Sequence, residues 1–313
     1  MADEKIPLAV VLGPTASGKT ALAVDLALRF GGEIVSADSM QIYKGMNIAT
    51  AKPTPAEMRG VPHHLMDFLD PSEGFSVADY AALAHQTIRE IRSRQRLPIL
   101  AGGTGLYIDA VVNNISFAEI KTDPRLREEL MQLAQQKGAV YLLNELKGFD
   151  PDTAAKLHPN NLPRIIRAIE VYRLTGVTMA EHQRRSKMNP TPYRSVLIGL
   201  GFRDRQKLYE RIDARVDRML ENGLLEEART VLQKKGLKTA AQAIGYKELK
   251  RYFDGEESLA EAAEKIRQES RRYAKRQLTW FRKNTSVSWL YVDDYQNMEE
   301  LAENAAEKLK NLL

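Results

Sequence analysis

The eight-residue stretch GPTASGKT near the N-terminus constrains this chain more than any other feature of its sequence. It follows an apolar run with β-branched residues at 6–12 and precedes a helical apolar pattern at 19–30. A strand, a glycine-rich turn and a helix N-terminus in this order allow backbone N–H groups to surround phosphate oxygens. The stretch therefore predicts a loop that binds a di- or triphosphate. The residues expected to line it are Gly13, Thr15, Ala16, Ser17, Gly18, Lys19 and Thr20.

Further apolar runs and helical patterns alternate after this loop. Short strands are expected at 33–37 and 97–101, with an amphipathic helix at 77–94 between them. The proline-containing segment 40–75 has no clear period and is expected to be mainly loop. Strand, loop and helix repeated in this way predict an α/β fold, with a P-loop NTPase-like parallel sheet and helices on both of its faces.

The pattern changes at about residue 122. Helices are expected at 125–137, from Asp150-Pro151 onward and at 162–175, and no strand is expected before 195–202. We therefore expect residues 121–190 to form an all-helical insertion domain, and residues 1–120 with 191–313 to form the core. The C-terminal part is expected to contain helices at 204–222, 224–235, 244–253 and 259–283, a strand at 287–292 and a closing helix.

Charge is spread unevenly along the chain. Residues 1–120 hold 10 Lys and Arg against 13 Asp and Glu, whereas residues 121–187 hold 12 against 8 and residues 201–283 hold 21 against 14. Basic regions outside a compact phosphate site fit a polyanionic partner, although solvated helix faces rich in Lys and Arg give the same composition.

The composition of the chain also indicates the cellular compartment in which the protein is expected. The chain has no cysteine, so disulfides, thiol nucleophiles and cysteine zinc sites are excluded. It has no apolar run near the 18 or so residues that cross a membrane, and its acidic start does not resemble a secretory signal. We expect a cytoplasmic protein with no membrane segment.

Three polar groups near the phosphate loop are candidates for chemistry. Lys19 supplies a mobile cation and the Thr20 hydroxyl a ligand for Mg²⁺. A hydrolase of this class usually carries a metal-binding Asp at a neighbouring strand end, but the strand 97–101 runs into Gly102-Gly103-Thr104. Asp38 instead follows the strand 33–37, at the sheet edge where ligands bind. It is a candidate general base, and the alternative is an Asp that caps the next turn.

Six ordered motifs carry a resemblance over about residues 6 to 292. They are GPTASGKT, IVSADSMQIYKGMNIATAKP, ILAGGTGLY, DPxxAxxLHPNNLPRIIRAIEVYRLTG, QAIGYKE and RRYAKRQLTWFRK. Together they resemble the bacterial tRNA dimethylallyltransferases, which are prenyltransferases. The combination with DSMQIY and GGTGLY is far more specific than the phosphate loop alone, which many kinases share.

The resemblance implies a reaction and its partners. Dimethylallyl diphosphate would occupy the loop in which a kinase holds ATP, with Mg²⁺ as cofactor. The dimethylallyl group would pass to N6 of the adenine 3′ of the anticodon, in tRNAs that read codons beginning with U. Diphosphate would leave. The tRNA anticodon stem-loop is then the macromolecular partner, and we expect a monomeric enzyme.

The resemblance also implies roles for individual positions. Asp38, Thr104 and Arg127 are expected at the reaction site, and Thr15 to Thr20 around the diphosphate. The residues expected to contact tRNA are Asp38, Ser39, Met40, Gln41, Asn160, Asn161, Leu162, Pro163, Arg164, Gln242, Gly245 and Lys247. Asn161 stands where relatives carry Asp, which leaves one RNA contact in doubt.

The residue types suit an allylic transfer. Positive charge develops on carbon as diphosphate leaves, so Lys19, the loop amides, Mg²⁺ on Thr20 and Arg127 would stabilise the leaving group. Asp38 would accept the adenine N6 proton, and Thr104 would orient a phosphate oxygen or a base edge. Helix capping at 105–113 is the alternative for Thr104.

A basic and aromatic segment near the C-terminus, 271–282, is expected to back the cleft and touch phosphates. For its aromatic side chains, among them Tyr273, Trp280 and Phe281, we favour burial in the core. The target adenine itself must leave the stack of anticodon-loop bases before it can react.

Three other functions fit parts of the sequence. A small-molecule kinase could use the same loop, with Asp38 deprotonating a hydroxyl. An adenylate isopentenyltransferase would prenylate a free nucleotide, and an RNA-binding NTPase-like switch would not catalyse transfer at all. The helical insertion and the basic C-terminal half favour RNA as the substrate.

Overall fold

The computed structural model describes residues 5–117, 123–310 and 312. They form two compact units, one of residues 1–112 with 191–313 and one of residues 113–190. The smaller unit thus starts eight residues before the expected boundary at 121. Hydrogen bonds from Asn114 Nδ2 to the Pro190 carbonyl and from the Ser116 N–H to the Ser186 carbonyl pair its first residues with its last ones.

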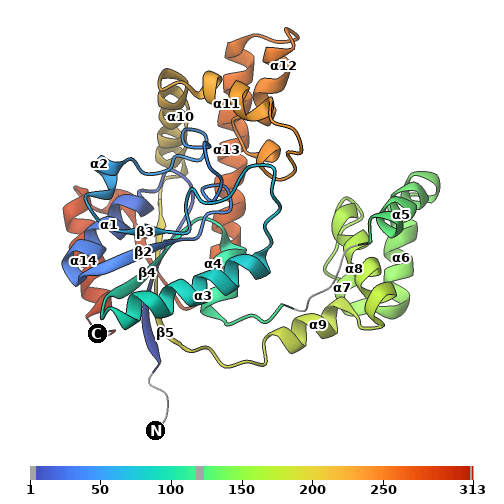
Figure 1. The fold of residues 1–313 in the computed structure, drawn as a ribbon, viewed down its shortest axis with the longest axis horizontal. Coiled ribbons are helices and arrows are strands. Elements are labelled where there is room, and N and C mark those ends of the chain that lie inside the picture. The colour runs from blue at the N-terminus through green and yellow to red at the C-terminus, as the bar shows by residue number, and fades with distance from the viewer. Residues whose placement is uncertain (1–4, 118–122, 311, 313) are drawn as a thin grey trace. The chain divides into compact units, whose positions relative to one another are not determined.

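The larger unit is built on a six-stranded parallel sheet (Figure 1). In spatial order the strands are β3 (His63–His64), β2 (Gly32–Ser36), β4 (Leu97–Gly102), β1 (Ile6–Leu12), β5 (Tyr193–Gly201) and β6 (Val287–Tyr291). This arrangement confirms the predicted α/β class. β1 lies between β4 and β5, and helices cover both of its faces, which explains its continuous apolar sequence.

Helices cover both faces of the sheet. The helices described in the larger unit are α1 (Lys19–Phe30), α2 (Pro55–Met58), α3 (Val77–Ser93), α4 (Gly105–Val112), α10 (Arg205–Glu221), α11 (Leu224–Leu232), α12 (Lys250–Phe253), α13 (Leu259–Phe281) and α14 (Met298–Leu309). Of these, α1 and α14 lie on one face and α3 and α4 on the other. Alternate residues of β1 point to opposite faces. Val11 packs with side chains of α1 and α14, whereas Val10 packs with side chains of α3 and α4.

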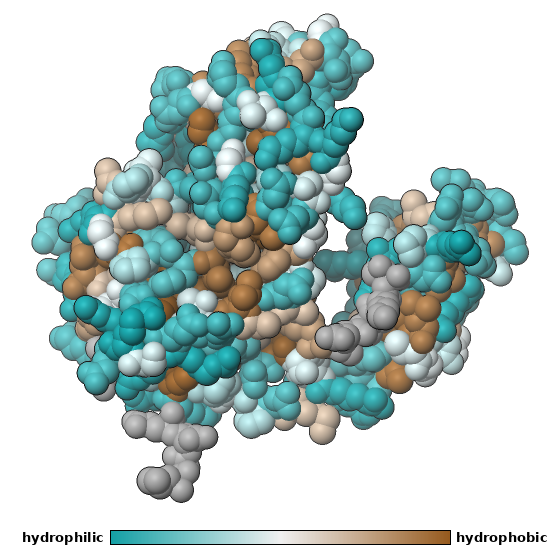
Figure 2. Space-filling model, in the orientation of Figure 1, coloured by the Kyte–Doolittle hydropathy of each residue, from teal (hydrophilic) through white to brown (hydrophobic). Residues whose placement is uncertain are grey.

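A further apolar cluster lies beyond the sheet, between α10, α11, α13 and the segment after β2. Tyr43 and Met46 of that segment are fully buried beside Val216 and Ile266. The segment 40–75, expected to be mainly loop, therefore contributes core side chains. It also holds α2 and the two-residue strand β3, which is too short to show a period. In Figure 2, hydrophobic residues gather in the middle of the larger unit's visible face, while hydrophilic residues dominate its upper lobe.

The smaller unit is helical among its described residues, with its own core. Its helices are α5 (Pro124–Lys137), α6 (Ala139–Phe149), α7 (Pro151–Ala154), α8 (Leu162–Thr175) and α9 (Met179–Ser186). Leu130, Leu142, Leu146, Ile165 and Ile169 are each fully buried in one cluster. The Asp150 carboxylate links two of its elements, because it accepts hydrogen bonds from the N–H groups of Thr153 and Ala180.

One predicted helix is wrong. The segment 244–253 does not form a continuous α-helix but a 3-10 turn at Lys247–Leu249 followed by α12. Gly245 has a φ of +102°, which an α-helix cannot contain, and its N–H donates to the Glu248 carboxylate instead of to a helical carbonyl. Within the described chain, no helix is both long and apolar enough to cross a membrane.

The close approach of β2 and β4 gives a test of the fold. A Cβ on Gly102 would lie 2.2 Å from the Ala37 carbonyl oxygen, a backbone atom that cannot turn away. Gly102→Ala should therefore lower the free energy of unfolding by about 1–3 kcal/mol. Gly74→Ala is the control, because nothing lies within 4 Å of its added methyl. Denaturant unfolding followed by the fluorescence of Trp280 and Trp289 measures both, and equal midpoints would contradict the packing.

Candidate functional site

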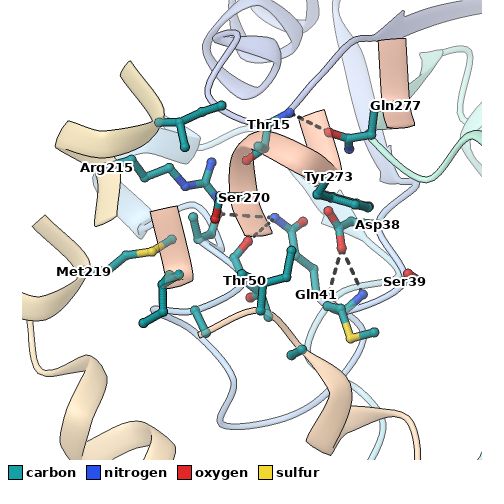
Figure 3. A pocket seen from close by; sticks show the side chains of 18 of the residues that line it. Thr15, Asp38, Ser39, Gln41, Thr50, Arg215, Met219, Ser270, Tyr273 and Gln277 are labelled. Carbon is teal, nitrogen blue, oxygen red and sulfur yellow. Dashed lines mark hydrogen bonds between the residues drawn. The ribbon is translucent and has the colours of Figure 1, made fainter. Parts of the chain in front are cut away.

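A cavity of about 310 Å³ opens at the carboxyl ends of β1, β2 and β4. Its lining residues are Thr15, Lys19, Thr20, Asp38, Ser39, Met40, Gln41, Ala49, Thr50, Ala51, Ala101, Gly102, Ile212, Arg215, Val216, Met219, Gln242, Ala243, Ile244, Lys247, Ile266, Ser270, Tyr273, Arg276 and Gln277. One wall thus comes from the phosphate loop and strand ends, and the facing wall from α10, α13 and the segment 242–247. Figure 3 shows the side chains of Asp38, Gln41, Arg215 and Tyr273 around this cavity.

The phosphate loop has the backbone that its sequence predicts. Gly13 has a φ of +152°, and a Cβ there would lie 2.7 Å from the Leu200 carbonyl oxygen of β5. Gly18 has a φ of +91° at the N-terminus of α1. Ala16 adopts a left-handed conformation, φ +63°, that is uncommon outside glycine. The Lys19 ammonium folds back over the loop and donates to the Pro14 carbonyl at 2.6 Å.

Five charged side chains of the described chain line the cavity: Lys19, Asp38, Arg215, Lys247 and Arg276. The pKa of Lys19 is lowered from 10.5 to about 7 by desolvation and by the positive charge of Arg215, while Asp38 opposes the shift. Desolvation also lowers the pKa of Arg215, again against the effect of Asp38. These four cations and one carboxylate leave an excess of positive charge, which a bound anion would stabilise.

Asp38 caps a turn and also lines the cavity, and its role as a general base stays a prediction. Its Oδ1 accepts hydrogen bonds from the backbone N–H groups of Met40 at 2.9 Å and Gln41 at 3.4 Å, so it caps the turn after β2. The same side chain lines the cavity beside the phosphate loop. Capping therefore fixes the carboxylate at the cavity wall instead of excluding it from chemistry.

Thr104 does not cap α4 through its side chain. Its Oγ1 accepts a hydrogen bond from the Ser39 N–H at 3.0 Å and donates to the Ser39 Oγ at 3.3 Å. This pair joins the ends of β2 and β4. Ser39 lines the cavity, whereas Thr104 lies behind it among the residues that contact the lining, and its place at the reaction site stays a prediction.

The Gln41 amide is held on three sides. Ser36 Oγ donates to its Oε1, and its Nε2 donates to the carbonyls of Thr50 and Ala51, each at 3.2 Å. Two of the residues expected near RNA at the other wall, Gln242 and Lys247, line the same cavity. Gly245 lies between them in sequence and allows the turn described above.

The residues that sequence reasoning missed are mainly on α10 and α13. Gln277 of α13 accepts the Thr15 N–H through Oε1 at 2.8 Å and donates through Nε2 to the Gly103 carbonyl at 2.9 Å. One amide thus ties the phosphate loop to the turn after β4. Polar residues at 270, 273 and 277 share one helix face, and that spacing was the available signal.

The aromatic residues of α13 divide between core and cavity. Phe281 is buried in the core as expected, and Trp280 packs against the same cluster while its Nε1 donates to Asp109 Oδ2 at 2.8 Å. Tyr273, for which burial in the core was favoured, lines the cavity instead. Desolvation raises the pKa of Tyr273 to about 12, so its hydroxyl stays protonated at neutral pH.

The remaining predicted site residues belong to the smaller unit. The Arg127 guanidinium forms two hydrogen bonds of 2.9 Å with the buried carboxylate of Glu170, which also accepts from Arg167. Asn160, Asn161, Pro163 and Arg164 are exposed at the start of α8, and Leu162 is half-buried. Their predicted roles in catalysis and RNA contact stay predictions.

The donor groups at the cavity fit a loosely held magnesium ion. Among the described residues, no group of three or more His, Cys, Asp or Glu side chains could hold a metal. The Thr20 hydroxyl and the Asp38 carboxylate nevertheless line the cavity. Mg²⁺ usually binds through one or two protein oxygens together with substrate phosphates and water, so a full protein cage is not required.

These features define a class of protein: a parallel-sheet protein whose phosphate loop opens into a cavity with cationic and apolar walls. The IPP transferase family model matches residues 41–284. This match covers more than half of the chain, and the chain therefore belongs to the IPP transferase family.

Individual relatives extend the match to almost the full length. The chain is 49% identical to a tRNA dimethylallyltransferase of Caldanaerobacter subterraneus, covering 98% of this chain and 99% of the relative. It is also 49% identical to a tRNA dimethylallyltransferase of Bacillus subtilis, covering 96% and 95%.

Solved structures agree with these relatives. The crystal structure of a tRNA isopentenylpyrophosphate transferase from Bacillus halodurans is similar, with 46% identity and a TM-score of 0.72, over 99% of this chain and 98% of that one. A eukaryotic dimethylallyltransferase, described as acting on tRNA, has 28% identity and a TM-score of 0.80, over 96% and 77%.

The pKa of Lys19 makes anion binding depend on pH. The free site loses the ammonium proton at about pH 7, and a bound diphosphate would raise that pKa. Affinity for inorganic diphosphate should therefore fall as pH rises from 7 to 9, by up to about tenfold per pH unit. In Lys19→Gln the contribution of the ammonium group to this pH dependence should be absent, and only the titration of the diphosphate itself should remain. Calorimetric titrations over that range measure both proteins, and the same slope in each would contradict the assignment.

Proposed function

We propose that this chain transfers the dimethylallyl group of dimethylallyl diphosphate to N6 of the adenine 3′-adjacent to the anticodon, in tRNAs that read codons beginning with U, and releases diphosphate. Membership of the IPP transferase family and the names of the relatives support this reaction. One structural observation carries it: the phosphate loop and a wall of apolar side chains line the same cavity. That wall includes Ile212, Val216, Met219, Ile244 and Ile266.

The apolar wall suits the donor's chemistry. A dimethylallyl group carries no hydrogen-bonding atom, so it gains from contact with aliphatic side chains and offers nothing to a polar pocket. Its diphosphate requires the opposite surroundings, namely loop N–H groups and the cations Lys19 and Arg215. Both surroundings meet in one cavity. A kinase that held ATP there would place a polar nucleotide or acceptor against the apolar side chains.

The cations stabilise the leaving group. The bond between C1 of the donor and the bridging oxygen breaks, and its electron pair stays with the diphosphate. Lys19, Arg215 and loop N–H groups would stabilise this growing negative charge, with Lys19 exchanging its hydrogen bond to the Pro14 carbonyl for one to a diphosphate oxygen. Mg²⁺, held by Thr20 and phosphate oxygens, would add positive charge to the diphosphate when bound.

Asp38 completes the transfer on the adenine. The lone pair of N6 forms the new bond to C1, and N6 then carries an extra proton. The Asp38 carboxylate, held at the cavity wall by the Met40 and Gln41 N–H groups, accepts this proton. Arg127 stays a prediction as a further reaction-site residue.

We assign the tRNA to two sets of groups. Ser39, Met40, Gln41, Gln242 and Lys247 line the cavity, where they can hold a base that has left the anticodon-loop stack. The exposed start of α8, including Asn160 and Arg164, is assigned to the anticodon stem-loop, with binding that weakens as salt rises. The cytoplasmic location, the monomeric state and the use of Mg²⁺ belong to this proposal.

One assay separates this function from its alternatives. The protein is incubated with Mg²⁺, radiolabelled dimethylallyl diphosphate and, in separate reactions, unmodified tRNA, AMP or ATP. Label in tRNA supports the proposal. Label in AMP alone would identify an adenylate isopentenyltransferase, and phosphate release from ATP without prenyl transfer would identify a kinase or NTPase.

The proton-accepting role of Asp38 gives a second prediction. Asp38→Asn keeps an oxygen that can cap the turn but removes the basic carboxylate. Turnover should fall by roughly 10²–10⁴-fold, the usual contribution of a general base, with a smaller effect on tRNA affinity. Asp254→Asn, at an exposed position after α12, is the control. Single-turnover rates measure the effect, and an unchanged rate would remove Asp38 from the mechanism.

A further inference from the structure

Behind the cavity, the carboxylate of Glu227 on α11 accepts four hydrogen bonds. Its Oε2 accepts the backbone N–H groups of Asn47 at 2.6 Å and Ile48 at 2.8 Å. Its Oε1 accepts the N–H of Ala49 at 2.9 Å and the hydroxyl of Tyr246 at 2.8 Å. Three successive N–H groups around one anion form a nest, which is a specific and stabilising arrangement.

These donors come from two segments that both line the cavity. Ala49 and the two residues after it line the cavity, and the carbonyls of Thr50 and Ala51 hold the Gln41 amide. Tyr246 belongs to the segment 242–247, which lines the cavity from the facing side. The two segments also touch directly, since a Cβ on Gly245 would lie 3.4 Å from the Ala49 Cβ. Glu227 therefore fixes one segment against the other.

Only a carboxylate satisfies this set of donors. It accepts at both oxygens, whereas a glutamine of the same shape would turn an NH₂ group toward N–H or O–H donors. Desolvation and the adjacent Glu227 charge raise the pKa of Tyr246 well above its usual range, so the phenol stays a donor. Tyr246 is fully buried and gains no alternative partner from solvent.

We propose that Glu227 is a positioning residue for the tRNA substrate. It sets the spacing between the 47–51 loop, which holds Gln41, and the 242–247 segment, and so shapes the part of the cavity assigned to the flipped base. It acts through these segments and not on the reacting atoms. None of its four partners belongs to the phosphate loop, so binding of diphosphate at that loop is independent of it. This proposal rests on the proposed function, which assigns tRNA as the acceptor.

The test measures the effect of one substitution separately on the KM for tRNA and on the affinity of the phosphate loop. Glu227→Gln should raise the KM for tRNA by about tenfold, because several hydrogen bonds to a charged group are lost. The Kd for inorganic diphosphate should change by less than about twofold, because the loop at 13–20 keeps its contacts. Glu226→Gln, an exposed neighbour on the same helix, is the matched control and should leave both values unchanged. A parallel loss of diphosphate affinity, or an unchanged KM for tRNA, would overturn the proposal.

A milder variant covers the case in which Glu227→Gln does not fold. Tyr246→Phe removes one of the four hydrogen bonds to Glu227 and should raise the KM for tRNA about two- to fivefold without changing the Kd for inorganic diphosphate. An unchanged KM in this variant would also overturn the proposal.

Hydrogen exchange separates failure of this proposal from failure of the proposed function. In the full-length chain, the amides of residues 47–49 should exchange at least about tenfold faster in Glu227→Gln than in the wild type, while those of the phosphate loop stay unchanged. Equal exchange at 47–49 would contradict the restraint itself. A wild-type protein that does not prenylate tRNA at all would instead refute the function on which the substrate assignment rests.

Discussion

The confinement of two cations, Lys19 and Arg215, in one small cavity is the constraint on which the rest of this site depends. Desolvation and mutual repulsion make the protonated form of Lys19 costly, and the single carboxylate of Asp38 only partly offsets that cost. A bound diphosphate supplies the missing negative charge. In the proposed reaction, the same cations would lie where charge grows as the C–O bond breaks, so an unfavourable arrangement in the free protein would become stabilising in the transition state.

The fold positions these groups through a few long-range contacts. The parallel sheet places the phosphate loop and Asp38 at one edge, as it does in other open α/β sheets. α13 then closes the site, because Gln277 bonds both the Thr15 N–H and the Gly103 carbonyl. Helix and sheet edge thus form one rigid frame. The apolar wall on α10 and α13 faces the loop across this frame, which gives the cavity its division between anion and hydrocarbon.

Short-range sequence patterns correctly predicted those elements whose conformation is determined by residues close to them in the chain. The phosphate loop follows from its glycines and from the strand and helix beside it, and β1 from an apolar run buried on both faces. Asp38 follows from its place at a strand end. Arg215 and Gln277 could not be found in this way, since their partners lie about two hundred residues away in the chain and only packing brings them together. The prediction of a helix at 244–253 was wrong because Gly245 takes a conformation that depends on its neighbours Ala49 and Glu248.

The central claim is that the loop holds a leaving diphosphate while carbon is attacked. Dimethylallyl diphosphate labelled with ¹⁸O at the oxygen that bridges C1 and phosphorus tests it directly, with mass spectrometry of every product. The account predicts that all of the label leaves in diphosphate as prenylated tRNA forms. Label recovered in dimethylallyl alcohol, with unlabelled diphosphate and unmodified tRNA, would mean that the P–O bond breaks and would contradict it.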